Sequence, residues 1–321
     1  MNIFARQPIH VRRARHRYPA IAVILCCLAD LSAAPVAAEP PRGGPERLVW
    51  SPVPVPETPY VAPNKPLTRI QDILATHAGE KSWIQPVVRT DAFAGDYISL
   101  APGEATKAMF FSEERVVIWV YKGKLDVEIE GQPKTVISDG YLIDVAPTLI
   151  HKLTNTGQES AIYFRLTSAG QKPSYPVTEN PEPIDGYSYV KVRMSPYGKY
   201  EAPNQPVLDF NRDVVAKNAG SRDFAMDGHT SAHIIRERGI ATPPDSEKGH
   251  FHANLPEIWL VIEGRIEAKI SGEPLVSGGV GDVILAAKSR WHRASAAGPG
   301  MSTRLALMPR YKEGLAVMQE P

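Results

Sequence analysis

The chain repeats itself once, and this duplication constrains the fold more than any other feature of the 321-residue sequence. The segment YVAPNKP, which begins at Tyr60, returns as YEAPNQP at Tyr200, 140 positions later. Three further pairs lie 141 positions apart, namely Gly123 and Gly264, Gly140 and Gly281, and His151 and His292. Two copies of a unit of about 140 residues are too few to stack as a solenoid, so the sequence predicts two packed domains.

Each copy has the residue pattern of a β-domain. The stretches VVIWVYKGKLDVEIEG and EIWLVIEGRIEAKISG alternate around a glycine turn, which predicts a β-hairpin in each copy. The stretch RIQDILATHAG has helical spacing and ends in glycine, which predicts one short helix in front of each set of strands. Thirty prolines and 24 glycines supply turns between short strands, a pattern typical of a β-sandwich or β-barrel.

The sequence outside the two copies predicts an exported protein. Residues 1–38 place a basic stretch before the apolar AIAVILCCLADLSAA and end in a small-residue cleavage site before Glu39, so they predict a signal peptide and a periplasmic or secreted chain. The pair Arg12-Arg13 leaves open whether export follows the general or the twin-arginine route. The remaining predicted ranges are a proline-rich leader at 39–58, an N-terminal domain at 59–172, a Pro-rich linker at 173–199 and a C-terminal domain at 200–321.

The net charge and the cysteine content limit which partners the chain can bind and which side chains can serve as metal ligands. Thirty-six basic and 35 acidic residues nearly cancel, so there is no electrostatic case for nucleic acid or an anionic membrane as a partner. Both cysteines, Cys26 and Cys27, lie in the predicted signal peptide. The mature chain would then have neither disulfides nor thiolate ligands, and any metal must be bound by histidine and carboxylate.

Such side chains cluster in the second copy, in EKGHFHANLPEIWLVIEG. His250 and His252 are two positions apart, and residues i and i+2 of a strand face the same side. A Leu-Pro bend then allows Glu257 to re-enter the same space, and GDVILAAKSRWH brings His292 to the start of a later strand. Three imidazoles and one carboxylate predict one divalent metal ion, with open positions for a small ligand if the ion is octahedral.

These residues resemble the two motifs of the cupin superfamily. HFHANLPEIWLVIEG has the HxH, glutamate and glycine of the first motif at the family's spacing, and GDVILAAKSRWH has the glycine and histidine of the second. The departures fall at turn positions: Pro244 replaces a glycine of the first motif, and Ala287, Ser289 and Ala296 replace Pro, Gly and Asn of the second.

The resemblance covers both copies, from Leu67 to Pro309, and implies a bicupin. The implied fold is all-β, with two tandem jelly-roll-like cupin barrels that are each preceded by a short helix. The metal ligands that it implies are His250, His252, Glu257 and His292.

The first copy lacks this ligand set. Its matching positions are Met109, Phe111, Val116 and His151, and one imidazole among apolar side chains cannot hold a labile divalent ion. We therefore expect one metal ion per chain and an N-terminal barrel that is structural or has an apolar pocket. The identity of the metal is left open among Mn, Fe, Ni, Co, Cu and Zn.

Side chains beside the cluster are candidates for a substrate pocket. Trp259 shares a strand face with Glu257, Arg290 and Trp291 precede His292, and His233 lies on the strand before the HxH pair. Each has a structural alternative, which is core packing for the tryptophans and a solvated charge for the arginine. Arg236, Arg238 and Arg293 flank the same mouth. No catalytic acid or base beyond the ligands can be named.

The resemblance implies a metal-dependent oxidoreductase of the dioxygenase type that acts on a small oxygenated or phenolic compound. Cupins with this ligand set also include oxalate decarboxylases, lyases and isomerases, although oxalate chemistry normally accompanies two metal-bearing barrels. A non-catalytic periplasmic protein that binds a metal, a sugar or an organic acid is the alternative from a different class. The expected partner is a small molecule, with no stable membrane insertion after signal removal, and self-association into a homo-oligomer is left open.

Overall fold

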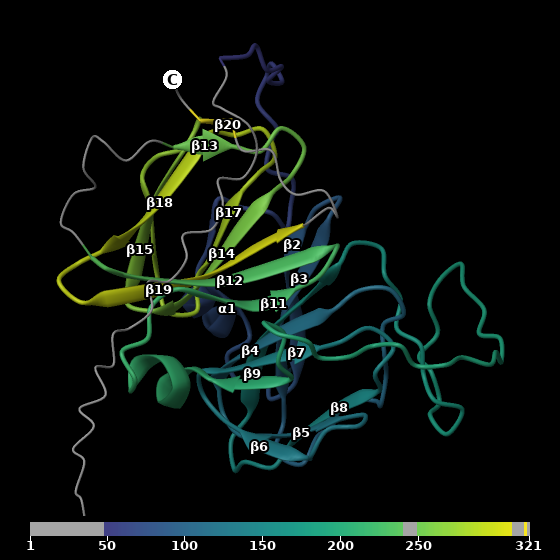
Figure 1. Cartoon of the computed structure of the whole chain (residues 1–321). Coiled ribbons are helices and arrows are strands. Elements are labelled where there is room, and N and C mark those ends of the chain that lie inside the picture. The colour runs from purple at the N-terminus through teal and green to yellow at the C-terminus, as the bar shows by residue number, and fades with distance from the viewer. Residues whose placement is uncertain (1–47, 240–248, 310–317, 320–321) are drawn as a thin grey trace, which may run out of the picture. The chain divides into compact units, whose positions relative to one another are not determined.

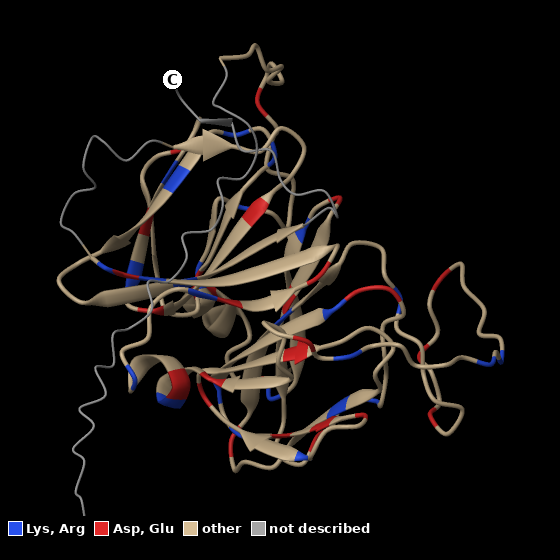
Figure 2. Cartoon of the chain, viewed as in Figure 1, with Lys and Arg blue, Asp and Glu red and all other residues tan. Residues whose placement is uncertain are grey.

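The computed structural model describes residues 48–239, 249–309 and 318–319, and nearly all their regular structure is β (Figure 1). The predicted signal peptide, with Arg12-Arg13 and both cysteines, lies outside the described residues, as does Pro244. None of the described helices is both long and apolar enough to cross a membrane. Basic and acidic residues are interspersed along the drawn chain (Figure 2).

Two facing antiparallel sheets form the first barrel. The larger has six strands in the order β10-β7-β4-β9-β3-β2, and the smaller has three in the order β6-β5-β8. The bounds in the larger sheet are Trp83–Arg89 for β2, Phe93–Leu100 for β3, Val116–Lys122 for β4, Tyr141–Val145 for β7, Ala161–Ser168 for β9 and Val207–Asp209 for β10. In the smaller sheet they are Leu125–Ile129 for β5, Thr135–Ile137 for β6 and His151–Asn155 for β8.

The second copy repeats this plan with a six-stranded sheet, β1-β17-β14-β19-β12-β11, and a five-stranded sheet, β16-β15-β18-β13-β20. The bounds in the first are Leu67–Thr68 for β1, Arg222–Met226 for β11, Thr230–Arg238 for β12, Glu257–Glu263 for β14, Val283–Ala286 for β17 and Met301–Pro309 for β19. In the second they are His250–Phe251 for β13, Arg265–Ile270 for β15, Val276–Gly279 for β16, His292–Ala297 for β18 and Met318–Gln319 for β20. A short helix precedes each set of strands, α1 at Ile70–Thr76 and the π-helix η1 at Asn211–Val215. The predicted all-β fold with two barrels and two short helices is confirmed.

The two copies exchange their leading strands. β1 comes from the first copy but pairs with β17, and β10 comes from the second copy but pairs with β7. The repeated tyrosine secures each exchange, since the Tyr60 hydroxyl donates to the Leu285 carbonyl at 2.7 Å and the Tyr200 hydroxyl donates to the Asp144 carbonyl at 2.8 Å. Each predicted domain range thus contributes a strand to the other barrel, and the predicted domain boundaries stay predictions.

The repeated asparagine ties each leading segment back to its own copy. The Asn64 side-chain amide donates to the Arg89 carbonyl at 2.6 Å and accepts from the Arg89 N–H at 2.7 Å. Asn204 makes the same pair of hydrogen bonds with Met226, at 2.8 Å and 2.6 Å. Since an amide that mimics a backbone pairing needs both its donor and its acceptor, these contacts explain why asparagine recurs in both copies.

The two predicted hairpins are wrong. β4 pairs with β7 and β9, whereas β5 pairs with β6 and β8, and β14 and β15 are separated between two sheets in the same way. A register shift near the end of each long strand, between Val120 and Lys122 and between Val261 and Glu263, turns the chain into the facing sheet. Gly123 and Gly264 follow with φ of 102° and 67°, a backbone conformation that favours glycine. The alternating pattern is therefore that of a strand that rounds a barrel corner.

Both faces of each large sheet are buried. Along β14, Trp259 and Val261 pack in an apolar cluster inside the second barrel. Ile258, Leu260 and Ile262 point the other way, into a cluster shared with Phe164 and Leu166 of the first copy. All described residues belong to one compact unit, which this shared core helps to form. Burial on both faces explains why β14 is a continuous apolar run, while alternation decides which side chains face the barrel interior.

Candidate metal centre

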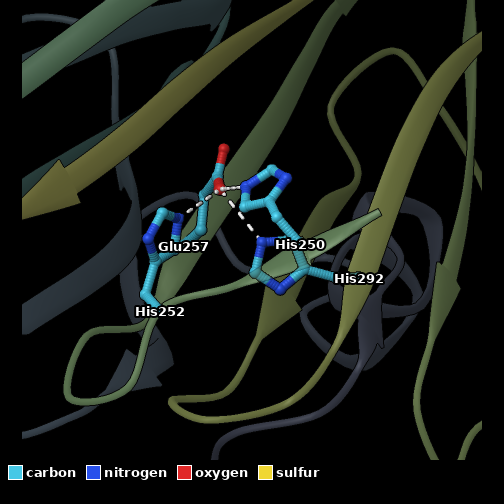
Figure 3. A group of neighbouring side chains, drawn as sticks. All are labelled: His250, His252, Glu257 and His292. Carbon is cyan, nitrogen blue, oxygen red and sulfur yellow. Dashed lines mark hydrogen bonds and ion pairs between the residues drawn. The ribbon is translucent and has the colours of Figure 1, made fainter. Parts of the chain in front are cut away.

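The four predicted ligands come together at one end of the second barrel (Figure 3). His250 lies on β13 and pairs with His292, the first residue of β18. His252 follows β13 directly, and Glu257 is the first residue of β14. One ligand atom from each side chain lies within 4.8 Å of the other three. No other group of three or more His, Cys, Asp or Glu side chains within residues 48–239, 249–309 and 318–319 has such an arrangement.

The Oε2 atom of Glu257 is the point on which the three rings converge. It lies 3.2 Å from Nε2 of His292, 3.3 Å from Nε2 of His252 and 3.6 Å from Nε2 of His250. All three imidazoles thus present the same ring nitrogen to one carboxylate oxygen, as Figure 3 shows. Three imidazole nitrogens and one carboxylate oxygen form a donor set that suits divalent transition metals, so the residues present fit a metal ion.

Two ligands are held in orientation by contacts on the side away from this point. His292 donates from Nδ1 to the Arg290 backbone carbonyl at 2.8 Å, and this contact directs Nε2 towards Oε2 of Glu257. Trp259 donates from its indole nitrogen to Oε1 of Glu257 at 2.6 Å, which leaves Oε2 facing the histidines. Hydrogen bonds of this kind fix ligand geometry and raise metal affinity.

Three of the four candidate ligands are buried. His252, Glu257 and His292 are 3%, 5% and 1% exposed, whereas the side chain of His250 is 31% exposed. Burial raises the pKa of Glu257, but its contacts with the three histidines lower the pKa well below the usual range. The carboxylate is therefore ionised and supplies the negative charge that a cation needs, and His250 marks the side open to a ligand.

The structure places Trp259 and Arg290 in supporting positions. Trp259 is 2% exposed, and its ring meets that of His292 edge-on at 5.4 Å. The guanidinium of Arg290 lies 4.7 Å from the centre of the Tyr60 ring. It also donates to the Thr58 carbonyl at 2.9 Å, the Ser271 carbonyl at 2.6 Å and the Glu273 carboxylate at 3.1 Å. Its charge thus holds the leading segment of the first copy against the second barrel.

Trp291 and His233 are half-buried. Trp291 packs on Gly249, where an added Cβ would lie 2.1 Å from the ring, and its indole nitrogen has no hydrogen-bond partner. His233 is aligned on β12 opposite Ala306, the residue that also lies opposite Trp259, so it shares the interior face of the sheet. Its Nδ1 pairs with Asp223, a partner that the sequence analysis did not identify. Arg236, which was expected to flank the mouth, instead pairs with Glu263 at 2.9 Å, at the end of β14 away from Glu257.

The first barrel has no equivalent centre among its described residues. His151 pairs with Met109 through the backbone and stacks on Phe111, with ring centroids 6.4 Å apart. Burial lowers the pKa of His151 to about 4, so its ring is neutral, and its Nδ1 has no hydrogen-bond partner. The apolar neighbours are those that the sequence predicted for this position, but the ring nitrogen without a partner was not predicted.

Replacing Trp259 with Phe should weaken metal binding about 10- to 100-fold, because Glu257 loses the hydrogen bond that orients it. A competition titration with a chelating dye measures the affinity. Trp291→Phe is the matched control, since that indole N–H has no partner, and its affinity should stay close to that of the unmodified chain. Equal losses in both variants would contradict the orienting role of Trp259.

Replacing His151 with Leu should flatten the acid limb of the stability curve. With a folded-state pKa of about 4 against an ordinary 6.5, the unfolded chain takes up a proton that the folded chain refuses as the pH falls. The stability present above pH 6.5 is therefore lost towards pH 4, by about 3 kcal/mol for this group. Urea unfolding of both metal-free proteins across this range gives the difference, in which the other titrating groups cancel. Parallel curves would show that His151 contributes nothing.

Comparison with known proteins shows the fold and not the activity. No protein-family model and no curated protein matches the chain. A salicylate 1,2-dioxygenase from Pseudaminobacter salicylatoxidans is similar in structure, with a TM-score of 0.53 at 11% identity over 76% of this chain and 82% of that one. A cupin 2 conserved barrel domain protein from Leptotrichia buccalis has a TM-score of 0.47 at 11% identity over 76% and 96%. The S161A mutant of Bacillus subtilis oxalate decarboxylase has a TM-score of 0.44 at 12% identity over 74% and 75%. The described chain has the cupin fold in two copies.

Proposed function

We propose that the chain is a metal-dependent oxidoreductase of the dioxygenase type that acts on a small oxygenated or phenolic compound at the second barrel. The observation that carries this proposal is the convergence of three Nε2 atoms and one carboxylate oxygen within 4.8 Å. Three of these side chains are closed off from solvent, and the fourth, His250, is 31% exposed. A buried donor set with one open side suits a metal that also binds a small ligand.

His250, His252, Glu257 and His292 would hold the ion. When bound there, a redox-active divalent ion supplies polarisation of a substrate oxygen and a route for electrons to O₂. The single negative charge of Glu257 leaves a net positive charge at the centre, which favours an anionic or ionisable oxygen ligand. Trp259 keeps the second carboxylate oxygen engaged, and the apolar cluster beneath it limits water behind the ligands.

The oxidoreductase reaction should appear as oxygen uptake that matches substrate loss. The metal-loaded chain is incubated with catechols, flavonols, oxalate and uronates while O₂ consumption and CO₂ release are followed. His250→Ala sets the background because it should lose the metal. Release of CO₂ without net oxygen uptake would assign a decarboxylase instead. Retained metal with ligand-induced spectral change but no turnover would assign a binding protein.

We also propose that the mature chain is exported and begins at Glu39. The support is the order of basic stretch, apolar stretch and small-residue site in residues 1–38, together with the confinement of both cysteines to that segment. Mass spectrometry of the chain purified from cell fractions should find an N-terminus at Glu39 in the periplasm or medium. An intact Met1 in the cytoplasmic fraction alone would refute export. Elemental analysis of the same material identifies the metal.

A further inference from the structure

A cavity of about 480 Å³ opens at the N-terminal barrel, within the size range of small-molecule sites. Its walls include Met109 and Phe111, which hold the positions that His250 and His252 occupy in the second copy. Two of the four positions that correspond to the metal ligands thus line this cavity, whereas Val116 and His151 do not. It is also lined by Arg89, Asp96 and Arg165, and by the first residues of the linker.

Arg165 brings a positive charge to the interior side of the large sheet. It lies opposite Ile118 on β4, as Ala306 lies opposite Trp259 on β14, and it takes the place of that alanine 141 positions later. Both Ile118 and Tyr163, two residues before Arg165 on β9, belong to the apolar cluster inside the first barrel. The arginine side chain is only 23% exposed, and a cation so placed is costly unless it is paired.

That pairing is incomplete. Arg165 donates from Nη2 to Asp96 at 3.1 Å, while its buried Nε has no hydrogen-bond partner. Asp96 is also engaged by Arg89, so one carboxylate serves two guanidinium groups. Gln171 lines the same cavity, and neither its amide nitrogen nor its amide oxygen has a partner. The charged side chains that line the cavity are the cations Arg89, Arg165 and Lys172 and the carboxylate Asp96. Their net charge is therefore +2.

We propose that this cavity binds a small organic carboxylate with an aromatic or other apolar body. Arg165 and Gln171 line the cavity and each has a buried donor without a partner, and a guanidinium matches the planar shape of a carboxylate. Phe93, Met109, Phe111 and Tyr175 supply apolar wall for the body of the ligand. The site needs no metal and lies in the other barrel, so it is independent of the proposed function.

Benzoate is the probe. Isothermal titration of the full chain after the metal is removed by chelation should show one benzoate per chain, because the cavity of the first barrel needs no metal. Benzyl alcohol, which keeps the ring and lacks the charge, should bind at least about tenfold more weakly. Inorganic phosphate, which lacks the apolar body, should also bind more weakly. Equal binding of benzyl alcohol, tighter binding of phosphate, or loss of benzoate binding on chelation would overturn the proposal.

Two substitutions should move the benzoate affinity in opposite directions. Arg165→Met should weaken it about tenfold or more, and Asp96→Asn should tighten it several-fold because both guanidinium groups lose their competing carboxylate. Arg265→Met is the matched control, since Arg265 is exposed on β15 in the other barrel. If Arg165→Met fails to fold, Asp96→Asn decides alone. An affinity that Asp96→Asn leaves unchanged or weakens means that the arginine and aspartate are a structural pair only.

Discussion

The two large sheets bury both of their faces, and the placement of Glu257 and Trp259 follows from this. One face closes the interior of its own barrel, and the other forms the core shared between the copies. Because neighbouring residues on a strand point to opposite faces, a side chain on β14 has only two destinations. Glu257, Trp259 and Val261 share a parity that faces the barrel interior, so the carboxylate and the indole that orients it lie on the same side.

The interiors of the two barrels carry charges of opposite sign, and these charges lie at different positions of the repeat. In the second copy, Glu257 lies at the mouth with Trp259 beneath it, and the neighbouring strand offers the small Ala306. In the first copy those positions hold Val116, Ile118 and Arg165. A large ring beside a small residue is thus replaced by a smaller side chain beside a long one. The charge has changed from a carboxylate that suits a cation to a guanidinium that suits an anion.

Much of the fold and the four clustered side chains could be predicted from local spacing. HxH on a strand, the glutamate after a bend and the distant histidine fix ligand directions without knowledge of the strand order. The pairing partners of the strands were harder to predict, because two strand-forming runs joined by a glycine look the same in a hairpin and in a strand that turns a corner. Strand exchange could not be read from either copy alone. Arg290 has the parity of His292, yet long-range contacts with Thr58 and Tyr60 decide where its guanidinium lies.

The exchange of leading strands gives the first copy a structural role in the second barrel, although the first copy lacks the metal ligands. Its leading segment reaches the second barrel, where Thr58 and Glu57 accept from the Arg290 guanidinium and β1 extends the sheet that carries Glu257. The carbonyl of the same arginine accepts from Nδ1 of His292 and so sets the orientation of a candidate ligand. Arg290 therefore links the leading segment of the first copy directly to His292 of the candidate metal centre. The second barrel depends on the first for this support whether or not the first binds anything itself.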